Sequence, residues 1–206
     1  MKILIVALEY FEPEWQQTLK CIQATGLPYT IVSRDGVGNM SRAFNSVKVH
    51  PFDYDFLWFI TNILFEKSIP FTLAENIGNH VAIHPAFASS DHRHQHPDGS
   101  GQVKEVPFIE FTAPMFKTWA FVQTKLDEML PYYYMDLDIC HRLKQAGHTV
   151  AVDHSTKIDH VYLRNNKIDH PITRIRKQLR NYHTPLSQAH MVKKWGPDWE
   201  TKLWPK

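Results

Sequence analysis

Short apolar runs alternate with amphipathic segments along the first 60 residues. Residues 3–8 and 56–60 are continuously apolar, as expected for strands buried on both faces, and residues 29–33 predict a further short strand. Between these runs, apolar positions recur at helical spacing in residues 13–26 and again in residues 39–47. This βαβαβ order predicts an α/β protein with a parallel sheet and helices on both faces.

The second half of the chain resumes the pattern after an irregular stretch. Residues 89–101 are rich in Pro, Gly and His, and we expect a mobile surface loop there. Order is expected to resume at residues 106–111. Helices are then expected at about 119–129 and 136–147, and strands at 149–152 and 157–163. The spacing predicts that these helices bury Trp119, Val122, Leu126 and Met129, and Ile139, Leu143 and Ala146.

The last fifth of the chain predicts a basic amphipathic helix over residues 171–186. We expect its apolar positions to face the core: Ile172, Ile175, Leu179, Tyr182 and Leu186. Such a helix either docks on the domain with its basic face in solvent, or contacts an anionic membrane or an acidic glycan. Residues 1–165 are expected to form one domain, and residues 166–206 a basic helical extension packed on it.

The composition is that of an ordinary globular protein. Hydrophobic residues make up 43% of the 206 residues and charged residues 21%, which excludes disorder over the whole chain. No apolar window approaches 18 residues and no signal peptide is evident, so no membrane span is expected. Two cysteines are too few for a disulfide framework, which favours a cytoplasmic location. The net charge of +2 gives no reason to expect a nucleic-acid partner.

Candidate ligand-binding residues follow the ends of the three N-terminal strands. In open parallel sheets, ligands bind beyond the carboxyl ends of the strands. Glu9, Asp35 and Asn62 stand at these ends. Gly36 and Gly38 lead into a helix, whose first N–H groups can receive a phosphate. The alternative for the two glycines is an ordinary turn from strand to helix.

An acidic motif begins the second helix of the C-terminal half. Asp136 and Asp138 follow three consecutive tyrosines and point to different sides of the helix start. One of them can cap the helix while the other faces a cleft, and the helix dipole keeps such a carboxylate ionised. The alternative is a capping residue beside an acid that only faces solvent.

Several motifs stand in a recognisable order along the chain. Those between residues 111 and 162 are Leu126-Asp127-Glu128, Tyr132-Tyr133-Tyr134-Met135-Asp136-Leu137-Asp138, His141-Arg142-Leu143, Ala146-Gly147 and Ile158-Asp159-His160. Upstream stand Gly36-Val37-Gly38 and Ser41-Arg42-Ala43-Phe44-Asn45. Residues 1–165 thereby resemble the inverting GT-A glycosyltransferases of the large family that includes bacterial rhamnosyltransferases. The resemblance implies a Rossmann-like GT-A fold with a mostly parallel sheet flanked by helices.

The resemblance also implies a reaction. A hexosyl or deoxyhexosyl group would pass with inversion from a UDP- or dTDP-linked sugar to a hydroxyl of a glycan acceptor, in glycan or polysaccharide synthesis. Asp136 aligns with the family's catalytic base, which accepts the proton of that hydroxyl. Asp138 would support the helix start or the acceptor. Peripheral contact with a membrane through the basic tail is compatible with this activity.

The same resemblance assigns residues to the donor. Those implied in binding the nucleotide-sugar are Glu9, Asp35, Gly36, Gly38, Arg42 and Asn62. His160 would lie at the diphosphate or at a divalent metal, Mn²⁺ or Mg²⁺. The family holds this metal with an Asp-x-Asp motif after the third strand, but Thr61-Asn62-Ile63 stands there, and Met135 replaces the family's Glu. Because hard cations prefer carboxylates, we expect the metal to be weakly bound or dispensable, and Arg42, His160 and the helix start at residue 39 to share the diphosphate charge.

Two other functions are compatible with the sequence. The chain could be a non-catalytic relative that binds a nucleotide or sugar and has lost the metal motif. Alternatively, His92, His94 and His96 could form a metal site, because an extended strand would place all three on one side. An exposed histidine-rich loop explains the same spacing without a metal.

Overall fold

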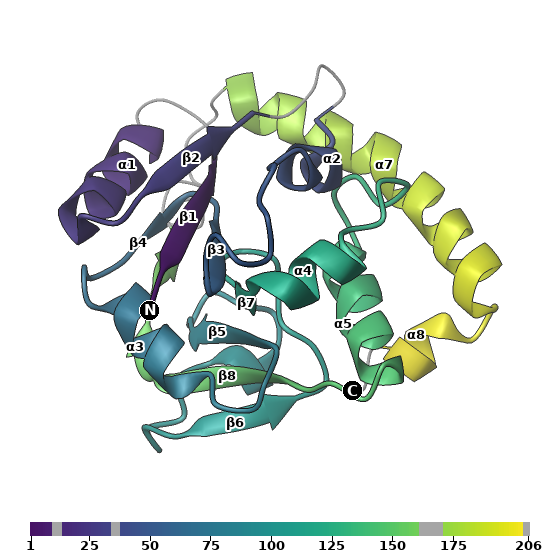
Figure 1. The fold of residues 1–206 in the computed structure, drawn as a ribbon. Helices are drawn as coiled ribbons and strands as arrows, with labels where there is room; N and C mark the ends of the chain where they lie inside the picture. Colours follow the sequence, from purple (N-terminus) through teal and green to yellow (C-terminus); the bar gives the residue numbers. More distant parts are fainter. Residues whose placement is uncertain (10–13, 34–37, 161–170, 204–206) are drawn as a thin grey trace.

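A seven-stranded sheet forms the centre of the molecule (Figure 1). The computed structural model describes residues 1–9, 14–33, 38–160 and 171–203. The strands are β1 (Ile3–Leu8), β2 (Tyr29–Val32), β3 (Phe56–Ile60), β4 (Ile63–Leu64), β5 (Ala82–Ala86), β6 (Val103–Val106), β7 (Met115–Lys117), β8 (Val150–Lys157) and β9 (Asp159–His160). The central sheet has the order β2-β1-β3-β7-β5-β8-β6, and β4 and β9 form a separate two-stranded sheet.

Most strands of the central sheet share one direction. β1 pairs in parallel with β2 and β3, and β5 pairs in parallel with β8. Only β7, which lies between β3 and β5, and the edge strand β6 run antiparallel to their neighbours. The prediction of a mostly parallel sheet is therefore confirmed, and the carboxyl ends of β1, β2 and β3 meet at one edge.

Helices cover both faces of this sheet, as predicted. Their bounds are α1 (Glu14–Thr25), α2 (Met40–Asn45), α3 (Ile69–Asn76), α4 (Thr118–Thr124), α5 (Met135–Gln145), α7 (Pro171–Trp195) and α8 (Trp199–Leu203), with a short 3-10 helix η1 (Arg93–Gln95). In Figure 1, α1 and α3 lie on one side of the sheet, and α2, α4 and α5 on the other. Successive residues of β1 point to opposite faces, so Ile5 packs with the α1 and α3 layer and Val6 with the α2, α4 and α5 layer.

Three local signals read from the sequence are confirmed at the ends of helices. Asn39 caps α2, because its side chain accepts a hydrogen bond from the backbone N–H of Arg42. Gly26 and Gly147 follow α1 and α5 with φ of +70° and +82°, which glycine adopts at little cost.

Several elements of the second half differ from the prediction. α4 ends at Thr124, because Lys125 adopts a φ of +46°, and Met129 is left 65% exposed rather than buried. Ala146 is exposed as well. The strand expected at 149–152 is present as the first part of β8, which continues to Lys157, and the strand expected at 157–163 is reduced to the short β9 in the part that the structure describes. Residues 161–163 of that prediction lie outside the described residues.

The histidine-rich segment 89–101 is more closely packed than expected. Gln95 lies in η1 and is fully buried, and Ser90 is nearly so. The backbone N–H of Phe87 donates to the Gln95 carbonyl, which ties the segment to the end of β5. The expectation of a surface loop is therefore wrong for Ser90 and Gln95, whereas Asp91 and Arg93 between them are exposed as expected.

The C-terminal helix α7 is longer than predicted and presents a different face to the protein. Tyr182 and Leu186, which were expected to face the core, are exposed, whereas His183, Ser187 and Met191 are buried. The side chains of Ile172, Ile175 and Leu179 lie outside the described set. In the part of the chain that the structure describes, no helix is long and apolar enough to cross a membrane.

Candidate functional site

The ends of β1 and β2 form one side of the expected donor-binding edge. The backbone N–H of Glu9 donates to Val32 O at 2.9 Å, which continues the parallel ladder past the last strand residue. The Ser33 hydroxyl then donates to Glu9 Oε2 at 3.0 Å. Glu9 and Ser33 are both exposed, so this carboxylate–hydroxyl pair faces solvent where a ligand could meet it. Asp35 and Gly36 lie outside the described residues.

Gly38 stands directly before α2 in a conformation that favours glycine. Its φ is +77° and it is buried. A side chain at this position would carry the steric cost of the left-handed region. Gly38, which precedes the capping residue Asn39, thus has a conformation that glycine adopts at little cost.

The start of α2 is bound to the protein's own backbone. Met40 N–H donates to Pro131 O at 2.7 Å, and Asn39 Nδ2 donates to Glu128 O at 3.0 Å. The Ser41 hydroxyl donates to Leu130 O at 2.6 Å. The sequence predicted that the first N–H groups of this helix could receive a phosphate. Two of them, those of Met40 and Arg42, already have partners within the protein.

Arg42 and Asn45 point toward the segment that precedes the acidic motif. Arg42 Nε lies 3.4 Å from Glu128 Oε2, in a pair whose side chains are both about half exposed. Asn45 exchanges hydrogen bonds with the backbone of Leu126, at 2.8 and 3.0 Å. The two halves of the sequence resemblance therefore pack against one another, with Arg42 held beside Glu128.

Asn62 and His160 are brought to the same place by the small second sheet. Ile63 is the partner of His160 in the antiparallel β4–β9 pair. Asn62 immediately precedes this pair at the end of β3, and it is almost fully buried. Residues that are almost 100 positions apart in the sequence thus become neighbours at the carboxyl end of the third strand.

Asp136 lies in the first turn of α5, next to a backbone residue in a rare conformation. Tyr134, the residue before the helix, has a φ of +65°, which is uncommon for a residue with a side chain. Asp136 is partly buried, and its Oδ1 accepts from Leu137 N–H at 2.9 Å. Burial raises the pKa of Asp136 to about 6, against the weaker effect of the backbone hydrogen bonds. The sequence predicted that the helix start would keep this carboxylate ionised, which implies a lowered pKa, and the direction of that prediction is wrong. With a pKa of about 6, most of the Asp136 carboxyl is nevertheless ionised at pH 7.

Glu110 is a second acid at this place, and the sequence analysis missed it. It lies two residues before Thr112, whose carbonyl accepts from Thr61 N–H at the end of β3. The preceding carbonyl, of Ile109, accepts a weak hydrogen bond from Cys140 Sγ, one helical turn after Asp136. Glu110 thus lies in a segment that packs against α5, on the side of the helix that carries Asp136 and Cys140. A lone acid within the apolar run Phe108-Ile109-Glu110-Phe111 was the available sequence signal.

The Glu110 carboxyl is held in place by the histidine-rich segment. The Ser90 hydroxyl donates to Glu110 Oε1 at 2.5 Å, and Glu110 N–H donates to the side-chain carbonyl of buried Gln95 at 3.0 Å. Burial raises the pKa of Glu110 to about 7, the charges of Asp136 and Asp91 act in the same direction, and the Ser90 hydrogen bond opposes them. The charge of Asp136 thus acts on Glu110, and the pKa values of the two acids, about 6 and about 7, both lie near neutral pH.

Asp138 has a different environment from Asp136. It is fully buried, and Arg142 Nε lies 2.9 Å from its Oδ2. Its Oδ1 accepts from Lys194 Nζ at 2.7 Å and from the Trp195 indole N–H at 2.9 Å. Asp138 thus joins α5 to the end of α7.

The three alternating histidines make separate contacts. His94 Nε2 is 3.0 Å from Phe108 O, and His96 Nε2 is 2.5 Å from Ser90 O. The rings of His92 and His94 stack and both meet the Phe108 ring edge-on. Within the described ranges, no group of three or more His, Cys, Asp or Glu side chains could hold a metal ion. At the predicted metal position, Asn62 and His160 offer an amide and an imidazole, a set that does not fit Mn²⁺ or Mg²⁺.

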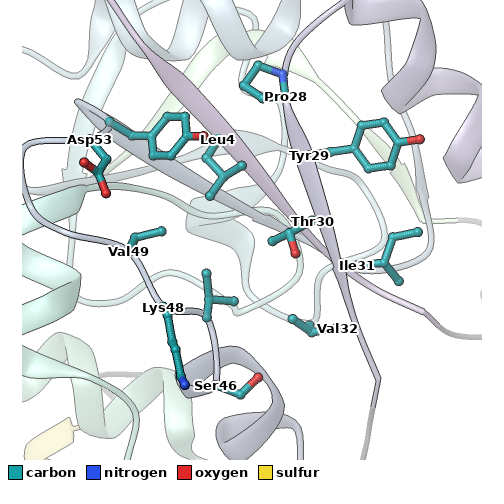
Figure 2. Close-up of a pocket in the computed structure, with 12 residues that line it drawn as sticks. Leu4, Pro28, Tyr29, Thr30, Ile31, Val32, Ser46, Lys48, Val49 and Asp53 are labelled. Atoms are coloured by element: carbon teal, nitrogen blue, oxygen red, sulfur yellow. The ribbon is translucent and has the colours of Figure 1, made fainter.

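A separate hollow of about 580 Å³ lies along the edge strand β2 (Figure 2). Thr30 and Val32 of that strand line it together with Leu4 of β1, and the opposite wall is the chain that follows α2, including Lys48. Among the candidate site residues that the structure describes, none lines this hollow. The candidate site is therefore defined by its polar side chains and does not coincide with this cavity.

Comparisons with solved structures identify the fold. GalNAc-T7, a GT-A glycosyltransferase solved with UDP, GalNAc and Mn²⁺, is 7% identical over 96% of this chain, with a TM-score of 0.55. The fold is GT-A-like. The protein A197 from STIV is 15% identical over 78% of this chain and 85% of its own, with a TM-score of 0.53. This GT-A-like chain spans 52% of the length of GalNAc-T7. No protein-family model matches it, and neither does any curated protein.

Proposed function

We propose that this protein is an inverting glycosyltransferase that moves a sugar from a nucleoside-diphosphate donor to an acceptor hydroxyl. The observation that carries the proposal is the carboxyl pair of Asp136 and Glu110, on a GT-A-like fold, beside the carboxyl end of β3. A single displacement needs one base on the acceptor side, and a partly buried carboxylate with a pKa of about 6 suits that task at neutral pH.

In the proposed reaction, Asp136 is the base. The acceptor oxygen attacks the anomeric carbon, the bond from that carbon to the diphosphate oxygen breaks, and a carboxylate oxygen of Asp136 accepts the hydroxyl proton. The diphosphate leaves with the bonding electron pair, so the configuration at the anomeric carbon inverts. Glu110, held by Ser90 and with a pKa of about 7, would be a second group on this side that can take up the proton.

The donor would lie over the ends of β1 and β2. The exposed Glu9–Ser33 pair can accept and donate hydrogen bonds to a ribose or a uracil or thymine base, as in a UDP- or dTDP-linked donor. Gly38 lets the backbone approach the donor closely, and Asp35 and Gly36 would complete this side. The diphosphate would contact Arg42, Asn62 and His160, three residues that the sequence already suggested for the donor side.

The donor-side charge is where this protein departs from a metal-assisted enzyme. The residues at the end of β3 do not fit a Mn²⁺ or Mg²⁺ site, so no step is assigned to a metal ion. Arg42, whose side chain is about half exposed, can turn from Glu128 to a diphosphate because a surface ion pair is weak. His160 pairs with Ile63, the residue after Asn62, and would add positive charge at this place when it is protonated.

Release of free nucleotide tests the proposal directly. A panel of UDP- and dTDP-sugars is incubated with glycan acceptors, and nucleoside diphosphate is measured with and without acceptor. We expect acceptor-dependent release from one donor, a product of inverted anomeric configuration by NMR, and loss of both in Asp136→Asn. Retention of configuration, or acceptor-dependent release that Asp136→Asn leaves unchanged, would contradict the proposed mechanism.

A non-catalytic role in binding a nucleotide or sugar is the second candidate. It is favoured by the residues after β3, where Thr61, Asn62 and Ile63 stand in place of the carboxylates of a metal motif. For this function, a donor nucleotide raises the melting temperature of the protein, but no combination of donor and acceptor releases free nucleotide. The two functions are therefore separated by the same panel.

A further inference from the structure

The two edge strands of the central sheet differ in how their open sides are protected. β6 carries Lys104 and Glu105, both exposed, and such charges discourage an edge strand from pairing with another chain. β2 carries no charged residue, and the side chains of Tyr29 and Ile31 are 41% and 43% exposed. Within the described ranges, β1 is the only strand that pairs with β2. The outer edge of β2 is therefore open to a further strand.

The hydrogen bonds to β1 show which backbone groups of β2 point outward. The carbonyl of Pro28 accepts a hydrogen bond from β1 at 3.0 Å, and that of Val32 accepts one from the residue after β1 at 2.9 Å. In a parallel ladder every second residue bonds to the same neighbour, so Tyr29 and Ile31 turn their N–H and C=O groups to the open edge. Because Pro28 faces β1, its missing N–H removes no donor from the open side.

The hollow beside β2 borders this open edge and has charges of opposite sign at its two ends. All residues from 28 to 32 line the hollow, so the backbone of the strand is accessible from it. Figure 2 shows Asp53 toward the Pro28 end of β2, and the ammonium group of Lys48 toward the Val32 end. Asp53 and Lys48 are both exposed. A partner that meets this edge therefore meets an acidic end and a basic end.

β2 suits antiparallel pairing with β2 of a second copy of the chain. A two-fold axis at Thr30 would place Tyr29 of each copy opposite Ile31 of the other, and such a pair exchanges both of its hydrogen bonds. Thr30 would face Thr30 across the axis. Aromatic–β-branched pairs and Thr–Thr pairs are among those that stabilise antiparallel strands. The outward backbone groups and the side chains of β2 are thus complementary to themselves.

The charges of the hollow match the same two-fold axis. Antiparallel pairing puts the Pro28 end of one strand beside the Val32 end of the other. Asp53 of each copy would then lie on the side of Lys48 of the other copy, once on either side of the axis. A foreign extended peptide could use the backbone edge, but it would have to supply both charges itself. Charge complementarity therefore favours a second copy as the occupant.

We propose that this protein forms a two-fold dimer through antiparallel pairing of its β2 strands, which joins the two central sheets into one. Because the strand is short, the interface belongs to the small, weak class, and we expect a dissociation constant on the order of 10 µM. This proposal is independent of the proposed glycosyl transfer, since Thr30, Lys48 and Asp53 have no part in it.

Sedimentation velocity of the full chain tests the proposal. We expect the weight-average sedimentation coefficient to rise from that of a monomer to that of a dimer between about 1 and about 300 µM protein. Thr30→Lys and Thr30→Glu each place like charges opposite one another at the axis, and each should weaken association at least tenfold. An equimolar mixture of these two variants should associate again, because opposite charges then meet at the axis.

Further variants separate the backbone edge from the charges. Ile31→Pro removes an N–H group that points outward but leaves the ladder with β1 intact, and should weaken association about tenfold. Lys48→Glu should weaken association, and adding Asp53→Lys to it should restore association. Glu105→Lys changes a charge on the other edge strand and should leave the dimer unchanged.

Melting curves establish which variants are folded, and the exposed Lys48 and Asp53 provide the test if the Thr30 variants unfold. The proposal is overturned if the parent stays monomeric over the whole concentration range. It is equally overturned if folded Thr30→Lys associates like the parent, if the mixture of the Thr30 variants does not recover association, or if the double charge reversal fails to restore it.

Discussion

Lys194 Nζ lies 2.7 Å from Asp138 Oδ1, and this ion pair joins the end of α7 to the first turn of α5. The same lysine is 2.6 Å from Asp127 Oδ2 in the segment before α5. Although burial raises the pKa of Asp127, its hydrogen bonds from Lys194 and His190 outweigh that effect and lower the pKa to about 2. Two acids thus hold the C-terminal helix, whereas Asp136, two residues from Asp138, is left for another role.

Removing the lysine should loosen α7 without affecting the carboxyl pair directly. Lys194→Met leaves buried Asp138 with only Arg142 as a cationic partner, and we expect a loss of about 2–3 kcal/mol in the free energy of unfolding. Lys193→Met changes the adjacent exposed lysine and should stay within about 0.5 kcal/mol of the parent. Urea titration measures both. Equal stability of the two variants would show that the Asp138 pair contributes little.

The two aspartates of the acidic motif should separate in a comparison of activity with stability. Asp136→Asn keeps the size of the side chain but cannot accept a proton, so we expect turnover to fall about 100-fold or more. Its melting temperature should not fall, because a buried carboxylate with a raised pKa is replaced by a neutral group.

Asp138→Asn is the matched variant. It should lower the melting temperature, because Arg142 loses the anionic partner at its Nε and Lys194 keeps only Asp127, and any loss of turnover should accompany that destabilisation. Initial rates and melting curves are measured on both proteins. A parental rate in Asp136→Asn would exclude this residue as the base and direct attention to Glu110.

The sheet was predictable from the sequence because its strands carry their own signal. The continuous apolar runs of β1 and β3 can be satisfied only by burial on both faces, and Asn39 and Gly147 mark helix ends by local chemistry. The inner face of α7 was not predictable in this way. Its burial follows from His183 and Ser187, polar residues that periodicity assigns to the surface.

The candidate site was predictable only where one motif contains it. Asp136 was found because its neighbours resemble a known base motif. Glu110 depends on Ser90 and on the passage of α5 over residue 109, contacts between segments that no local pattern connects. The direction of the Asp136 pKa was missed for the same reason, since burial by distant segments outweighs the helix start.

Gly38 should matter for donor binding beyond the strain that any replacement introduces. Gly38→Val introduces a branched side chain at a φ of +77°, at a position where the backbone would approach the donor. We therefore expect at least a tenfold loss of donor affinity. Gly147→Val carries a similar conformational cost at a φ of +82°, in open space at the end of α5. It should lower stability alike and leave donor affinity unchanged. Calorimetric titration with the donor nucleotide distinguishes the two variants, and equal affinities would remove Gly38 from the site.

Chelation should have little effect on donor binding. The residues after β3 provide Asn62 and His160 where carboxylates would be needed, so we expect EDTA to change donor affinity less than about twofold. The measurement is donor titration in EDTA and again after addition of excess Mn²⁺. A steep loss in EDTA that Mn²⁺ restores would show that a metal site is formed by residues we have not assigned.

Glu110 should make the protein less stable at high pH. Its pKa rises from an ordinary value of 4.5 to about 7 on folding, so the folded state binds this proton more tightly than the unfolded state does. Below about pH 4.5 the group is protonated in both states and contributes no penalty. As pH rises through 7, the folded state must ionise a buried acid beside Asp91 and Asp136, and stability is lost.

The free energy of unfolding of Glu110→Gln should therefore be up to about 3 kcal/mol higher than that of the parent at pH 8, and the difference should shrink toward pH 5. Glu105→Gln, an exposed glutamate on β6, controls for the change in net charge. Urea unfolding of the three proteins at both pH values measures the effect, and a Glu110→Gln advantage that is equal at pH 5 and pH 8 would contradict the assignment of the raised pKa to this residue.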